Sequence, residues 1–202
     1  DHRVGVVMAD EHRQRAAPQA HDEYADRSLA EGKAGERHRG VGQFEVRGVA
    51  DPDHGLPRAT ALKLQRAQAA RLAAAGGTML GKLATHEFAT GGPAYDLPFP
   101  PARNPWNRAH FTGGSSSGSG AAVAAGLVPL AMGSDTSGSI RGPAAFCGVA
   151  GFKPTYGLVP RTGVVPLAFS LDHCGPLAWT VEDCALAMEA IAGPDGEDPA
   201  EA

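Results

Sequence analysis

Two short turns hold the hydroxyl groups that could do chemistry in this chain. The first is a glycine–serine run at 113–120, which leads directly into an alanine-rich segment. The second spans 133–141 and contains Ser139, next to Gly138 and close to Arg141. Glycines let the backbone approach a bound group closely, and the first turn of a helix presents unpaired N–H donors. Both turns are therefore candidates to hold a charged or reacting oxygen atom.

The 113–120 turn, taken alone, leaves its role open. It could cradle a phosphate, although it matches neither the Gly-Lys-Ser/Thr ending of a Walker loop nor the Gly-x-Gly-x-x-Gly spacing. It could also be a flexible linker, although linkers do not usually run straight into a helix and a strand. Nothing in this turn by itself decides between these interpretations.

The second turn places a serine at the start of a predicted helix. Backbone N–H groups from Thr136 to Ser139 could converge on a developing oxyanion, and losing one such donor typically costs about 10²–10³ in rate. Asp135 and Arg141 flank the turn with opposite charges, so an ion pair could hold its shape. Considered alone, the segment is more simply explained as a capped helix with a surface ion pair.

Both turns, taken with the segments around them, resemble the amidase signature family. The resemblance covers roughly 70–193, and several long motifs occur in the family's order. These motifs are Gly-Gly-Ser-Ser-Ser-Gly-Ser at 113–119, Gly-Ser-Asp-Thr-Ser-Gly-Ser-Ile-Arg at 133–141, Pro-Ala-Ala-Phe-Cys-Gly at 143–148, and the landmarks at 81–89, 151–157 and 171–177.

The resemblance implies a serine mechanism without a cofactor or a metal. Ser139 would be the nucleophile, and Ser115, preceded by a cis peptide bond from Gly114, would pass the proton to a neutral lysine. Attack would give an acyl-enzyme with loss of ammonia or an amine. The implied oxyanion and substrate-binding residues are Thr136, Ser137 and Gly138, and the implied supporting residues are Asp135, Arg141 and Ser116.

The lysine base is where this chain departs from the family. The family's lysine lies in a Val-x-x-Lys-Asp segment, whose place here falls near residues 35–45, and no lysine or such motif occurs there. Lys82 belongs to a different landmark, while Lys33 and Lys63 have no matching context. We therefore assign no lysine to the site and predict weak or absent activity for this chain.

Three functions remain open at this point. The chain could be a stand-alone amidase, the glutaminase subunit of a tRNA-dependent amidotransferase, or an inactive fragment that retains the motifs. A small-molecule amide is the expected substrate, and a homodimer or amidotransferase subunits are the expected protein partners. The formal net charge of −4 gives no reason to expect direct contact with nucleic acid or a membrane.

Residues 59–202 contain the elements that must position the two turns. Strong helix formers at 61–75 predict a helix that Gly76-Gly77 stops, followed by a short buried strand at 78–80 and a long ordered loop at 91–112. The further elements expected are helices near 119–125, from about 139, and at 180–192, with a strand near 128–132. The fold class is α/β, a mixed β-sheet core covered by helices as in the amidase signature fold, expected to be incomplete at both ends.

Residues 1–58 form an atypical N-terminal region. They hold half of the acidic residues and five of the eight histidines, without a sustained apolar period. Such a composition does not bury enough apolar surface to offset the entropy of ordering. We interpret this region as disordered or unrelated to the family, through truncation of the gene or translation in a wrong frame.

The other reactive residue types have simpler interpretations. Three cysteines without Cys-x-x-Cys spacing predict buried, reduced thiols rather than disulfides or a zinc site, and Cys147 is expected to pack in the core. His86 and His173 are expected to be structural, and the aromatic side chains of the long loop are expected to pack. With no long apolar run and no secretory signal pattern, the chain is expected in the cytoplasm.

Overall fold

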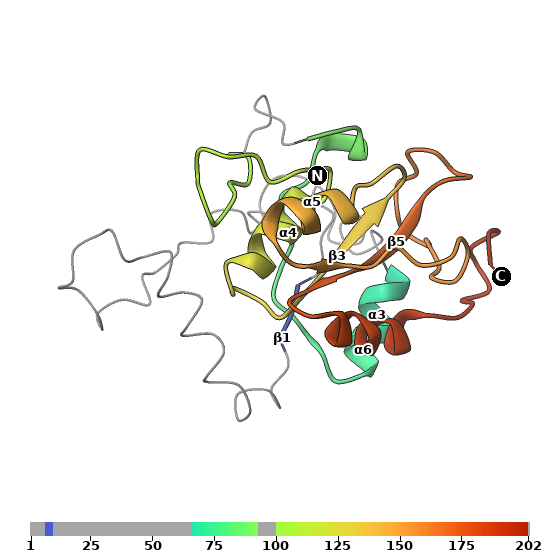
Figure 1. Cartoon of the computed structure of the whole chain (residues 1–202). Helices are drawn as coiled ribbons and strands as arrows, with labels where there is room; N and C mark the ends of the chain where they lie inside the picture. The colour runs from blue at the N-terminus through green and yellow to red at the C-terminus, as the bar shows by residue number, and fades with distance from the viewer. Residues whose placement is uncertain (1–6, 10–65, 93–99, 202) are drawn as a thin grey trace, which may run out of the picture.

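A computed structural model describes residues 7–9, 66–92 and 100–201 (Figure 1). Its centre is a five-stranded sheet with the strand order β2-β1-β3-β5-β4, in which every pairing is antiparallel. The strands are β1 (Val7–Ala9), β2 (Thr78–Met79), β3 (Leu130–Asp135), β4 (Ala150–Gly151) and β5 (His173–Ala178). The helices are α3 (Arg66–Ala74), the 3₁₀ turn η2 (Glu87–Ala89), α4 (Ser117–Ala124), α5 (Arg141–Cys147) and α6 (Val181–Ile191).

Helices cover both faces of the sheet, as Figure 1 shows around the central strands β3 and β5. Successive residues of a strand point to opposite faces, so neighbours on β3 enter different cores. Ala131 packs with Ile140 in the cluster beneath α4 and α5, whereas Met132 packs with Leu72 and Ile191 in the cluster beneath α3 and α6. The predicted α/β sheet covered by helices is confirmed.

Local signals in the sequence explain where two of the helices begin and end. After α3, Gly76 adopts a left-handed φ of 90° and the N–H of Gly77 returns to the carbonyl of Leu72 at 2.9 Å, so the predicted stop is confirmed. At the start of α6, the hydroxyl of Thr180 accepts the N–H of Asp183 at 3.2 Å, as the predicted cap requires. Residues 61–65, the expected first turn of α3, lie outside the described residues.

Two predicted elements differ from the structure. The strand expected to be buried at 78–80 is exposed: Met79 is 53% and Leu80 55% accessible, because β2 lies at an edge of the sheet and has a single partner strand. The helix expected to begin near Ser139 begins at Arg141, so Ser139 lies in the turn itself.

The N-terminal region contributes one described element. Strand β1 pairs with β2 on one side and with β3 on the other. The rest of 1–58, including Lys33, lies outside the described residues, so the interpretation of this region stays a prediction. Among the helices that the structure describes, none has the length and apolar character needed to cross a bilayer.

Candidate active site

Ser115 occupies the centre of the first turn, and its peptide bond with Gly114 is cis, as predicted. The residue is fully buried, and its carbonyl accepts hydrogen bonds from the Thr85 hydroxyl at 2.7 Å and the His86 N–H at 3.1 Å. A Cβ added at Gly114 would collide with the carbonyl oxygen of Gly91, so only glycine fits there. The segment around Thr85 and His86 therefore fixes the backbone of Ser115.

The hydroxyl of Ser115 is buried and has no hydrogen-bond partner among the described residues. Leaving a buried hydroxyl unpaired costs about 1–3 kcal/mol, so such a group indicates that a partner belongs there. Since the hydroxyl lacks any such partner, no hydrogen bond joins it to the ammonium groups of Lys82 and Lys153 or to the hydroxyl of Ser139; Lys153 instead donates to the carbonyl of Pro154 at 2.8 Å. Lys63 lies outside the described residues.

Asp135, the last residue of β3, organises the second turn. Its fully buried carboxylate accepts the N–H groups of Gly138 at 2.7 Å, Ile140 at 3.1 Å and Arg141 at 3.3 Å. The Arg141 guanidinium adds bonds to both carboxylate oxygens at 3.0 Å, which confirms the predicted ion pair. Burial alone would raise the pKa of Asp135, but these hydrogen bonds outweigh it and hold the pKa below its usual value.

This arrangement changes the expected set of oxyanion donors. Gly138 was expected to offer its N–H to the oxyanion, but that N–H already donates to Asp135. The N–H groups of Thr136, Ser137 and Ser139 have no acceptor among the described residues. Ser137 is exposed and Ser139 is 9% exposed, so this turn presents its remaining donors near the surface of the site.

Ser116 joins the two turns. Its N–H donates to the carbonyl of Ser139 at 3.3 Å, and its hydroxyl exchanges hydrogen bonds with the backbone N–H and carbonyl of Ser134 at 3.2 and 3.3 Å. A Cβ on Gly133 would lie 2.7 Å from that hydroxyl oxygen, so the contact also requires glycine there. Ser116, the residue that directly follows Ser115, thus contacts the backbone of Ser139.

The long loop holds the far end of α5. The side-chain amide of Asn104 donates to the carbonyl of Phe146 at 2.8 Å, and the indole N–H of Trp106 donates to that of Cys147 at 2.6 Å. Phe111 stacks edge-on against Phe146 with the ring centroids 5.6 Å apart. Trp106 and Phe111 therefore contact the helix that follows Ser139, but their side chains are 42% and 47% exposed, so the packing predicted for them is only partial.

Cys147 and the two histidines contact the site without a clear chemical role. Cys147 is fully buried and its burial raises its pKa to about 11, so the predicted packing role fits. The His173 ring contacts the backbone carbonyl of Asp135 at 3.2 Å and the ring of Tyr156 edge-on. The His86 backbone supports Ser115 through its N–H, whereas the Nδ1 atom of its ring is buried without a hydrogen-bond partner, so the structural role of the ring stays a prediction.

Asp172 is a residue of the site to which the sequence analysis gave no role. Its carboxylate accepts the hydroxyl of Thr136 at 2.6 Å and the N–H groups of Leu167 and Ala168 at 2.9–3.0 Å. Asp172 is 6% exposed and directly precedes β5. The available signal was an acidic residue inside the landmark at 171–177, immediately before a buried strand.

The comparisons with known proteins agree on one family. The family model described as "Amidase" matches residues 66–202. A subunit of the glutamyl-tRNA(Gln) amidotransferase from Roseiflexus castenholzii is 57% identical over 129 residues, covering 64% of this chain and 26% of that protein. Its counterpart in Cupriavidus necator is 44% identical over 195 residues, covering 86% of this chain and 38% of that protein. This chain therefore spans about a quarter to two fifths of the length of such relatives.

Solved structures show the same similarity. The corresponding subunit of the Thermotoga maritima glutamyl-tRNA(Gln) amidotransferase superposes with a TM-score of 0.65 at 48% identity, covering 67% of this chain and 30% of that one. The peptide amidase of Stenotrophomonas maltophilia superposes with a TM-score of 0.61 at 46% identity, covering 66% of this chain and 28% of that one.

Proposed function

The chain belongs to the amidase family, and on that premise we propose that it carries the serine half of an active site that cleaves a carboxamide C–N bond. The observation that carries this proposal is the buried, unpaired hydroxyl of Ser115, one residue from the Ser116 N–H that binds the Ser139 carbonyl. A buried hydroxyl without a partner, on a backbone that Ser116 joins to a turn with unoccupied N–H groups, suits proton transfer better than packing.

In the proposed reaction the Ser139 oxygen attacks the amide carbonyl carbon. Once the hydroxyls of Ser139 and Ser115 come within hydrogen-bond distance, the Ser139 proton passes to Ser115, whose own proton passes to a base, and the N–H groups of Thr136, Ser137 and Ser139 stabilise the oxyanion. The tetrahedral intermediate collapses with cleavage of the C–N bond, and the proton returns through Ser115 to the leaving nitrogen. Water then releases the acyl group from Ser139.

The proposed substrate is a small-molecule amide, and no cofactor or metal takes part in these steps. The base is the missing component, because no hydrogen bond joins a described lysine to the Ser115 hydroxyl. We therefore expect weak or absent turnover from this chain, which we place in the cytoplasm.

A second candidate function is that of the glutaminase subunit in a tRNA-dependent amidotransferase. Relatives 57% and 44% identical to this chain are named as subunits of the glutamyl-tRNA(Gln) amidotransferase, and the serine core suits both roles. In that case the reaction would free ammonia from glutamine and depend on partner subunits; a stand-alone amidase could instead act alone or as a homodimer. Glutaminase activity that appears only with the partner subunits would favour this second candidate.

A fluorophosphonate probe tests the proposal without requiring turnover. The oxygen of an activated serine displaces fluoride from such a probe and forms a phosphonate ester, so we expect a covalent adduct on the peptide that contains Ser139, detected by mass spectrometry. The matched control Ser139→Ala should lose the adduct, and Ser115→Ala should slow its formation. A chain that forms no adduct would instead be an inactive fragment that retains the motifs.

A further inference from the structure

We propose that Asp172 is a positioning residue that holds the oxyanion turn, 136–139, through the hydroxyl of Thr136. We call the hydrogen bond between the Thr136 hydroxyl and the Asp172 carboxylate the tether. Its existence is argued from the contacts around Asp172, whereas its effect on catalysis rests on the proposed function. Asp172 touches no reacting atom in this scheme, since it acts through Thr136.

The bond between the two side chains is short and sheltered. The Thr136 hydroxyl donates to a carboxylate oxygen of Asp172 at 2.6 Å, a distance typical of a hydroxyl bonded to a charged acceptor. Asp172 is 6% exposed and Thr136 is half-buried, so water competes poorly for the carboxylate. A bond to a charged group in such a place is among the stronger hydrogen bonds of a protein.

The tether lies where the β-ladder ends. Asp135 of β3 is in register with His173 of β5, and no pairing continues beyond them. Thr136 follows Asp135 and Asp172 precedes His173, so the side-chain bond joins the next two residues along the same pair of strands. It thereby extends the connection between β3 and β5 by one position, into the turn that carries the proposed donors.

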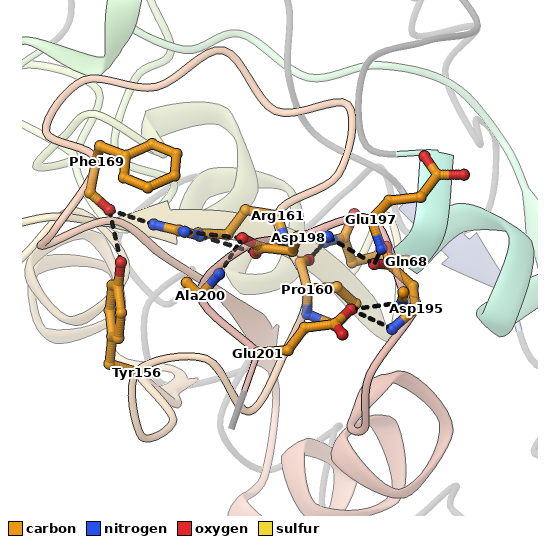
Figure 2. A network of polar contacts seen from close by, with 11 residues as sticks. Gln68, Tyr156, Pro160, Arg161, Phe169, Asp195, Glu197, Asp198, Ala200 and Glu201 are labelled. Carbon is orange, nitrogen blue, oxygen red and sulfur yellow. Dashed lines mark hydrogen bonds and ion pairs between the residues drawn. The ribbon is translucent and has the colours of Figure 1, made fainter.

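The far end of the tether is itself fixed, which a positioning role requires. The Asp172 carboxylate also accepts the N–H groups of Leu167 and Ala168, and the Asp172 N–H donates to the Ala168 carbonyl at 2.9 Å. The residues that precede Asp172 in the sequence are held by Arg161 (Figure 2). Arg161 forms an ion pair with Asp198 at 2.9 Å and donates to the carbonyl of Phe169. Segment 161–172 is therefore anchored at Arg161 and Phe169 and around Asp172.

Asp135 and Asp172 hold different parts of the oxyanion turn. Asp135 accepts N–H groups from Gly138 onward and makes no hydrogen bond with Thr136 or Ser137. Within the described part of the chain, the Thr136 side chain provides the only hydrogen bond that ties these first two residues to the rest of the fold. Since both offer unoccupied N–H groups, the tether would set the direction in which those donors point.

Thr136→Val and Thr136→Ser form a matched pair for the kinetic test. Valine keeps the shape of threonine and removes the hydroxyl, whereas serine keeps the hydroxyl. With a fluorophosphonate probe, Thr136→Val should lower the rate constant of phosphonylation on the order of tenfold, below the 10²–10³ typical for deleting an oxyanion donor outright. The dissociation constant of the non-covalent probe complex should stay within about threefold, because mainly the bond-forming step needs the donors.

The Thr136→Ser variant should be phosphonylated at close to the wild-type rate. A residue of purely structural importance would lower the unfolding temperature of Thr136→Val without a selective loss in the phosphonylation step. A phosphonylation rate for Thr136→Val equal to that of the wild type would overturn the positioning role.

A double-mutant cycle tests the tether independently of activity. Urea unfolding of Thr136→Val, Asp172→Ala and the double variant should give a coupling on the order of tenfold in the unfolding equilibrium constant, as contacting groups do, because alanine leaves no acceptor for the Thr136 hydroxyl. A factor near one would overturn the tether. A wild-type chain that does not react with the probe would overturn the proposed function. The coupling measured by urea unfolding would then decide alone whether the tether exists.

Discussion

The substitution Asp135→Asn tests how the nucleophile turn keeps its shape. In the structure one carboxylate oxygen accepts the N–H of Gly138 and one guanidinium nitrogen, and the other accepts the N–H groups of Ile140 and Arg141 and the second guanidinium nitrogen. Asparagine replaces one of these oxygens by an NH₂ group, which donates and does not accept. Whichever oxygen is replaced, at least one backbone N–H of the turn loses its acceptor.

The loss of unfolding free energy depends on which backbone N–H group loses its acceptor. The less costly orientation turns the NH₂ group towards Gly138, because the alternative would leave the N–H groups of both Ile140 and Arg141 unpaired. An unpaired buried donor costs about 1–3 kcal/mol, and the lost charge weakens the remaining bonds to this site. We expect Asp135→Asn to lower the free energy of unfolding by about 2–4 kcal/mol, a large share of the ~5–15 kcal/mol typical of a domain.

Arg141→Gln is the matched control. The Arg141 side chain is 53% exposed while the Asp135 side chain is fully buried, so water screens this pair in part; Arg141→Gln also leaves every backbone N–H of the turn paired with Asp135. Urea unfolding followed by tryptophan fluorescence should therefore show a much larger shift for Asp135→Asn than for Arg141→Gln. Equal shifts would refute the reasoning, because the carboxylate would then matter through the ion pair and not through the backbone of the turn.

Three further outcomes are expected from the remaining polar and buried groups. The Arg161 hydrogen bond lowers the pKa of Asp198 to about 2, below its ordinary 3.8. The charged carboxylate therefore stabilises the folded chain on the order of 2 kcal/mol. This contribution should be complete above about pH 4 and should be lost as the pH falls towards 2. Urea midpoints should show this loss in the wild type and a flatter profile in Asp198→Asn; identical profiles would contradict it. Burial raises the pKa of Cys174 to about 12, so iodoacetamide at pH 8 should alkylate it only in urea, and fast alkylation of the folded chain would disprove that burial. Thr180→Ala should cost about 1 kcal/mol in urea unfolding because α6 loses its cap, while Thr180→Ser should cost less; equal costs would argue against the cap.

Much of the candidate site could be predicted because its residues lie within short stretches of chain. The turn at 133–141 contains both partners of its ion pair, and the hydrogen bonds of the Asp135 carboxylate reach residues at most six positions away. Glycine positions and the resemblance likewise identified the turn at 113–120 and its cis bond. The cap of α6 and the stop of α3 follow from local hydrogen bonding in the same way.

Other features depended on the way distant segments come together. The exposure of Met79 and Leu80 follows from the edge position of β2, which an apolar run in the sequence does not specify. The N–H of Gly138 is a backbone group that every residue but proline carries, so its donation to Asp135 follows from the angles of the turn and not from residue type.

The sequence by itself determined the family, the two serine-bearing turns and the charges that flank the second one, because these are properties of short, ordered motifs. Only the tertiary structure decided that Ser116 binds the backbone of Ser139 and that Asp172 binds Thr136. The physical reason is range: Thr136 and Asp172 are separated by 36 positions, and their hydrogen bond exists because the pairing of β3 with β5 brings the ends of those strands together.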